Sequence, residues 1–252
     1  MYFNKAKYPA TALMFFSLFS STAVFSGSMG NTESSLFKGH FLAQLGWYSG
    51  IQGSAQNIHI RENLIGDHYT VKTHNQGSGL VGLGYLLDGP VIQNRFPISY
   101  GVDAFFLGQT AVSGYIIEER QFTNLSYRYK LQNIPVYFAA KTLINTKNDN
   151  VKLAIDAGIG PNFISASRYF ETALNEFTLL NNAFAKHETV AFSATVGASL
   201  RFNNAPGHLP IELGYRFFYL GEGRFRINNN QVINALKTGN NYANAFVCTV
   251  TL

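Results

Sequence analysis

The chain has 252 residues, of which 13% are charged and 15% are aromatic, and its formal net charge is +5. Soluble globular domains usually contain roughly 25% charged residues, and this positive charge is too mild and too scattered to indicate a nucleic-acid partner. A mean hydropathy of +0.01 is too low for a bundle of membrane helices, and a single cysteine excludes an internal disulfide. Few charges with many aromatic residues are typical of a membrane β-barrel.

Residues 1–26 have the features of a secretory signal peptide. Lys5 and Lys7 give a positive start, residues 12–19 form an apolar stretch, and Ser26 is a small residue at the cleavage point. The apolar stretch is too short and too rich in serine to span a bilayer as a helix. We therefore expect a signal peptide over residues 1–26 and a barrel domain over residues 27–252.

Eight segments alternate between apolar and polar or small residues with a period of two, as strands with unlike faces do. In chain order they are residues 37–47, 78–87, 98–106, 125–140, 151–160, 189–202, 211–219 and 242–252. Most reach the roughly 9–11 residues that a tilted strand needs to cross a membrane. An even number allows an antiparallel sheet to close, and pairing of the last strand with the first removes both exposed edges.

The links between these segments differ in length. Long links lie at residues 49–77, 166–187 and 221–240, and we expect a helical turn around Thr172–Leu180. The links after the second, fourth and sixth strands are short, and the link after the third is modest, with its hairpin tip at Ser113–Gly114. Long loops at one end and short turns at the other describe a barrel with long extracellular loops and short periplasmic turns.

The fourth strand changes the parity of its apolar residues halfway along. They are odd-numbered from Leu125 to Leu131 and even-numbered from Ile134 to Ala140. A β-bulge near Gln132–Pro135 would re-aim the side chains and tolerate the proline.

One face of the strands carries Phe, Val, Leu, Ile and Tyr throughout, whereas a soluble barrel needs a polar outer face. We therefore expect the apolar face to point outward toward lipid. The side chains that we assign to lipid are Val190, Phe192, Val196, Leu200 and Phe246.

The signal sequence, the eight strands, the seventh-strand segment Glu212–Phe217 and the strand-like C-terminus resemble the OmpA/OmpX/OmpW-type small outer-membrane barrels of Gram-negative bacteria. The resemblance covers nearly the whole mature chain and rests on pattern, without a diagnostic motif. It implies insertion by the barrel assembly machinery into the outer membrane, among its lipids and lipopolysaccharide. The machinery favours a terminal aromatic residue, and here we assign the assembly signal to Phe246, Val250 and Leu252.

With the apolar face outward, charged side chains of both signs point into the barrel. They are Lys38, His40, Asp103, Lys152, Asp156, Arg201, Glu212 and Arg216. Buried charges must be paired, and an eight-stranded interior is just wide enough for side chains to fill. Glu212 and Arg216 share a face, and Arg201 approaches Glu212 across a short turn. We expect a salt-bridged plug that includes a Glu212–Arg216 pair, with a narrow pore as the alternative.

Catalysis requires a nucleophile, a base and an orienting group. The histidine candidates are His40, His187 beside Glu188 and near Ser193, and His208, and none has a spacing typical of a catalytic site. We therefore expect no enzyme activity, no cofactor and no metal site.

The expected role is structural or surface-binding, with the long loops contacting a host surface, envelope partners or lipopolysaccharide. One alternative is a narrow passive channel for small solutes. Tyr169, Phe170 and Phe177 are consistent with an apolar mouth and equally with a position at the lipid interface. A lipid A-modifying enzyme is the other alternative.

Overall fold

The computed structural model describes residues 38–61, 65–72, 75–92, 96–148, 150–203 and 209–252. The expected signal peptide at residues 1–26 and the histidine at position 208 lie outside the described residues. Within the described ranges, no helix is both long enough and apolar enough to cross a bilayer.

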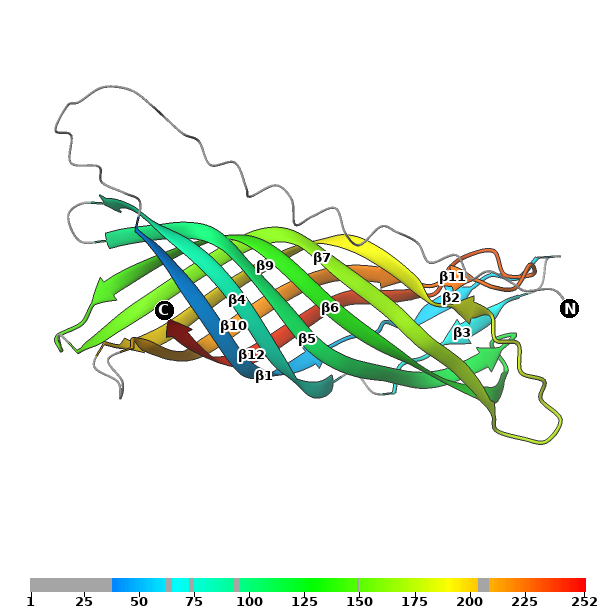
Figure 1. The fold of residues 1–252 in the computed structure, drawn as a ribbon. Helices are drawn as coiled ribbons and strands as arrows, with labels where there is room; N and C mark the ends of the chain where they lie inside the picture. The colour runs from blue at the N-terminus through cyan, green and yellow to red at the C-terminus, as the bar shows by residue number, and fades with distance from the viewer. Residues whose placement is uncertain (1–37, 62–64, 73–74, 93–95, 149, 204–208) are drawn as a thin grey trace, which may run out of the picture. The chain divides into compact units, whose positions relative to one another are not determined.

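Eight long strands form a closed antiparallel ring. They are β1 (Gly39–Ile51), β4 (Asn75–Ile92), β5 (Phe96–Glu118), β6 (Phe122–Asn145), β7 (Val151–Ala173), β9 (His187–Phe202), β10 (Ile211–Arg224) and β12 (Lys237–Thr251). The order β5-β4-β1-β12-β10-β9-β7-β6 is closed by pairing of β5 with β6. In Figure 1 the red β12 lies beside the blue β1, in a register from Leu42 opposite Thr251 to Ile51 opposite Tyr242. The predicted eight-stranded barrel, closed by its first and last strands, is confirmed.

The outer face of all eight strands exposes large apolar side chains. Examples are Leu45 at 64%, Leu83 at 73%, Phe138 at 63% and Phe246 at 75% exposure. Soluble monomers do not expose an apolar surface that encircles the molecule, because its contact with water would be unfavourable. This belt is covered by lipid, and the chain is a small β-barrel of the outer-membrane type.

Three strands are much longer than a membrane crossing requires. β5, β6 and β7 contain 23, 24 and 23 residues, against the roughly 9–11 that span a bilayer. The hairpin tip expected at Ser113–Gly114 is wrong, because both residues pair with β6 within the ladder. The chain turns instead after β5, where Glu119 and Arg120 have φ angles of 50° and 57°.

The β-bulge expected in β6 near Gln132–Pro135 is also wrong. Odd-numbered residues of β6 are buried along most of its length, and Pro135 keeps its register with Asn162 of β7. The extra residue lies in β5, between Leu107 and Thr110. The parity of the apolar residues changes because the surroundings of β6 change. From Ile134 onward its outer face is apolar and faces lipid, whereas before Ile134 its outer face meets water and its apolar residues point inward.

A sharp boundary marks this change on three neighbouring strands. An apolar row crosses the outer faces of β6, β7 and β9, and a polar row lies directly above it in the same register. The apolar row is Ile134, Phe163 and Val190, and the polar row is Gln132, Ser165 and Glu188.

The three long links fold together above this boundary. They contain β2 (Gln56–Ile58), β3 (Asp67–Tyr69), β8 (Phe184–Ala185) and β11 (Arg226–Ile227). β2 pairs with β3, β3 with the upper part of β5, and β8 with β11, while Ile60 bridges to Val232. We call these short strands, their connecting loops and the upper parts of β5, β6 and β7 the extracellular head.

The head has its own hydrophobic core, to which all three long links contribute, among them Ile58, Tyr69, Phe184, Phe225 and Leu236. The link expected at residues 166–187 begins later than predicted, because residues 166–173 belong to β7. The helical turn expected around Thr172–Leu180 is wrong, since Thr172 lies in the strand and the residues after Ala173 form bends and turns.

Candidate functional site

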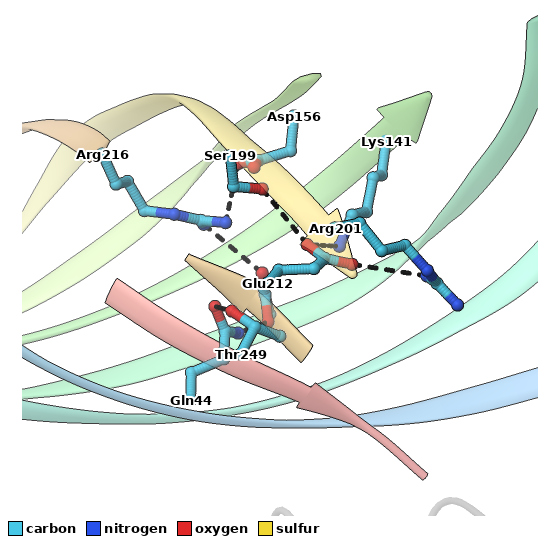
Figure 2. A network of polar contacts seen from close by, with 9 residues as sticks. Gln44, Lys141, Asp156, Ser199, Arg201, Glu212, Arg216 and Thr249 are labelled. Carbon is cyan, nitrogen blue, oxygen red and sulfur yellow. Dashed lines mark hydrogen bonds and ion pairs between the residues drawn. The ribbon is translucent and has the colours of Figure 1, made fainter. Parts of the chain in front are cut away.

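The periplasmic half of the barrel interior holds a network of charged side chains (Figure 2). Glu212 of β10, which is 2% exposed, accepts a hydrogen bond from Lys141 Nζ at 2.5 Å and one from Arg201 at 3.3 Å. Ser199 Oγ donates to the same carboxylate at 3.3 Å. One buried acid is therefore held by two cations and a hydroxyl, which satisfies the requirement that a desolvated charge be paired.

Arg216 lies four residues further along β10 and organises a second group of charges. Its guanidinium lies 3.4 Å from Asp103 and 2.7 Å from Asp156. The second contact lacks hydrogen-bond alignment, so Asp156 Oδ2 has no hydrogen-bond partner. Gln44 donates to Asp103 at 2.6 Å, and the guanidinium carbon lies 4.9 Å from the centre of the Phe105 ring, a cation–π arrangement.

The pairing expected between Glu212 and Arg216 is therefore wrong, because each binds other partners although they share a face. Lys141 was missed from the sequence. It follows Ala140, the last residue of the predicted fourth strand, and its odd number places it on the inner face of β6. Extending the alternation by one residue would have found it.

Three of the predicted interior charges are not among the side chains paired in this network. Lys38 is exposed and precedes β1. His40 lies near the periplasmic end, with its Nε2 atom 3.0 Å from Asp88 of β4. Lys152 is half-buried near the same end, opposite Arg201 in the register of β7 and β9.

An apolar layer fills the barrel above the charges. Phe105, Tyr137 and Phe218 contact one another, with ring centroids 5.2 to 6.2 Å apart, and Tyr48, Leu80, Leu107 and Leu220 complete the layer. Below it, a pocket at the periplasmic end measures about 30 Å³, which is room for about two water molecules.

A ring of amide side chains separates this layer from the core of the head. Asn162 donates to Asn133 at 2.9 Å and to the Leu220 carbonyl at 2.7 Å. Asn241 donates to the Gly221 carbonyl at 3.0 Å. Gly221 has a φ of 74° and lies at a register shift of β10, a conformation that suits glycine.

The side chains that we assigned to lipid lie on the outer face. They are Val190, Phe192, Val196, Leu200 and Phe246, with exposures from 47% to 75%. Ser193 and Thr195, on the opposite face of β9, are buried at 0% and 5%. Of the residues assigned to the assembly signal, Phe246 and Leu252 are exposed, and Val250 shares their face and is half-buried.

The catalytic candidates are not brought together. Ser193 is fully buried and donates to the Gly160 carbonyl at 3.0 Å. His187 pairs with Ala166 at the start of β9, and His40 pairs with Asp88. In the described ranges, no group of three or more metal-ligating side chains is arranged around a common point.

The loop between β7 and β8 is held at both ends and exposes apolar side chains between them. Glu171, which is 5% exposed, accepts hydrogen bonds from the backbone N–H groups of Asn181 at 2.9 Å and Asn182 at 3.0 Å. Asn175 Oδ1 accepts from the Phe177 N–H at 3.1 Å and forms a local turn. Phe177 and Leu179 remain 94% and 88% exposed.

The apolar mouth proposed for Tyr169, Phe170 and Phe177 is not formed, because these residues point to different surroundings. Tyr169 packs against the head core, and its hydroxyl forms a hydrogen bond of 3.1 Å with the hydroxyl of Tyr69. Phe170 is 48% exposed, and Phe177 lies in the exposed loop. Burial raises the pKa of Tyr69 far above its usual range, so its hydroxyl stays protonated.

No protein-family model matches the sequence, and neither does any curated protein. Solved structures of small outer-membrane barrels do match it. Neisserial surface protein A is 12% identical, with 84% of this chain and 97% of that chain covered and a TM-score of 0.37. OprG from Pseudomonas aeruginosa is 9% identical, with 86% and 97% covered and a TM-score of 0.46. Ail of Yersinia pestis, solved with a heparin analogue, is 12% identical, with 85% and 99% covered and a TM-score of 0.33.

Proposed function

We propose that this outer-membrane barrel is a non-conducting anchor that presents its extracellular head to partners outside the cell. The observation that carries the proposal is the filling of the barrel interior. From the periplasmic end upward, it holds paired charges, an aromatic and aliphatic layer, a ring of amides and the core of the head.

The paired charges support a plug more than a pore lining. Lys141, Glu212 and Arg216 are each 9% exposed or less, and each charged group is paired with a buried side chain of opposite charge. A wet, selective pore requires charges that face water and remain free to meet an ion. The aromatic layer directly above them would also block a path for ions.

The head supports the surface-binding part of the proposal. Its core holds the three long links in a defined arrangement, and the β7–β8 loop exposes Phe177 and Leu179 to water. Large apolar side chains that are held in an ordered loop, with no partner packed over them, are typical of contact surfaces.

Conductance in planar bilayers tests the anchor. The reconstituted protein should give no discrete current steps, and Glu212→Gln should give none either. Current steps from the native barrel, with a selectivity that shifts toward anions in Glu212→Gln, would instead support the narrow-channel alternative.

Attachment assays test the surface role. Cells that display the native barrel should attach to host-cell layers more strongly than cells that display Phe177→Ser with Leu179→Ser. Leu209→Ser is the matched control, because it removes an exposed leucine near the opposite end of the barrel, next to β10. Equal attachment by all three proteins would contradict a role for the β7–β8 loop.

A further inference from the structure

A groove of about 410 Å³ lies on the outer wall where the membrane boundary crosses β6, β7 and β9. Its apolar lower part is formed by Ile134, Phe163 and Val190. Its upper part is formed by Gln132, Ser165, Lys186 and Glu188. The groove therefore continues the lipid-facing belt upward into the headgroup region.

Positive charge lies just above the polar row. Lys130 pairs with Ser167 in the ladder, two residues above the pair of Gln132 and Ser165, and points to the same outer face. Lys186 immediately precedes β9 and lines the groove. The side chains on this wall thus change from apolar to polar to basic within two steps of the pleat.

The same order of chemistry is found in a membrane lipid that carries phosphate. Its acyl chains lie deepest, the ester or amide groups lie above them, and the phosphate lies at the level where basic side chains of membrane proteins gather. The match in polarity occurs at the height where the apolar belt meets water, which is the level of the lipid headgroups.

We propose that this groove binds an anionic, phosphate-bearing lipid of the outer leaflet. One acyl chain lies along Ile134, Phe163 and Val190, and the phosphate lies between Lys130 and Lys186. Glu188, which pairs with Lys186 at 2.9 Å, competes with the phosphate for that lysine. This site goes beyond the proposed surface function, because it concerns the membrane that holds the barrel.

The test measures how much bisphosphorylated lipid A stays bound to the full-length barrel in phosphatidylcholine nanodiscs, by native mass spectrometry. Lys130→Gln with Lys186→Gln should weaken retention about thirtyfold, as expected for two basic side chains next to an anionic lipid. Lys237→Gln is the matched control, because Lys237 is an exposed lysine that pairs with a glutamate, Glu222, at 3.1 Å outside the groove. It should retain lipid A as the native protein does.

Two further arms identify the chemistry that is recognised. Glu188→Gln should strengthen retention, because it frees Lys186, and lipid A without its phosphates should bind equally weakly to all variants. Native-like retention by the double lysine variant would overturn the proposal. So would equal retention of lipid A with and without phosphate, or weaker retention in Glu188→Gln, which would indicate a lipid ammonium group. None of these results depends on conductance or on attachment, so failure here leaves the proposed function open to its own tests.

Discussion

Replacing Arg216 by methionine should destabilise the barrel strongly, because it leaves two buried carboxylates without their shared cation. The side chains of Arg216, Asp103 and Asp156 are 8%, 4% and 10% exposed. Breaking a buried ion pair from one side costs about 3–5 kcal/mol. Asp103 keeps the hydrogen bond from Gln44, whereas Asp156 Oδ2 has no hydrogen-bond partner. We therefore expect most of the loss to arise at Asp156.

Double-mutant cycles can separate the two groups of charges. Combining Arg216→Met with Asp156→Asn should recover about 0.5–3 kcal/mol, the usual coupling between side chains in contact. Combining Arg216→Met with Glu212→Gln should give a coupling below about 0.5 kcal/mol, since these residues bind different partners.

The assay is equilibrium unfolding in urea of the barrel folded in lipid vesicles. It is followed by the fluorescence of Trp47, the only tryptophan, which is 63% exposed on the lipid face. A coupling between Arg216 and Glu212 as large as that between Arg216 and Asp156 would refute the division into two groups. A loss below about 1 kcal/mol for Arg216→Met would refute the dry plug itself, because screening by water would explain it.

Three further outcomes follow from the same structure. Val196→Arg places a charge on the lipid face and should cost roughly 2–4 kcal/mol. Ser199→Lys should cost less, because its new ammonium can reach Glu212. The yield of heat-modifiable folded protein should therefore be lower for Val196→Arg than for Ser199→Lys. Glu171→Gln weakens charge-assisted hydrogen bonds to the β7–β8 loop, so amide hydrogen exchange at residues 181–183 should become faster while the barrel strands stay protected. Phe177→Ser should change the free energy of unfolding in urea by no more than about 0.5 kcal/mol, because the side chain packs against almost nothing. A large loss of stability would show that the loop folds over this side chain.

The sequence was sufficient to predict the barrel because lipid imposes a simple pattern on its strands. In β9, Val190, Phe192, Val196 and Leu200 alternate with small and polar residues without interruption. The terminal alternation ending at Leu252 also indicated which strands close the ring. Both inferences need only the period of two and the rule that backbone polar groups in a membrane must be paired.

The upper parts of the strands could not be predicted from the same pattern. Above Ile134 the outer face meets water and the inner face meets the head core, so the two faces exchange their chemistry. If the outer face is assumed to meet lipid along the whole strand, this exchange is interpreted as a bulge or as the end of a strand. That assumption explains both errors, at Gln132–Pro135 and at Ser113–Gly114.

The partners within the charge network also lay beyond the sequence. Four-residue spacing on one strand places Glu212 and Arg216 on one face, but closure of the barrel brings β6 and β7 across to meet β10. Glu212 contacts Lys141, and Arg216 contacts Asp156, only across the barrel interior. Lys141 and Glu212 are 71 residues apart in the sequence. Tilt and stagger of the strands decide such contacts, and neither is encoded in local alternation.

The boundary between Ile134 and Gln132 has a consequence for the vertical position of the barrel in its membrane. Outward-facing positions of β6 from Ile134 to Ile144, at about 3.3 Å per residue and a tilt of about 40°, span about 25 Å. Sinking the barrel by one step would bring Gln132, Ser165 and the Glu188 carboxylate into hydrocarbon, and raising it would expose Phe163 and Val190 to water. A hydrophobic thickness that is fixed so sharply on one side leaves the lipid to adapt, so the bilayer should thin or thicken around β6, β7 and β9 before the barrel changes its depth.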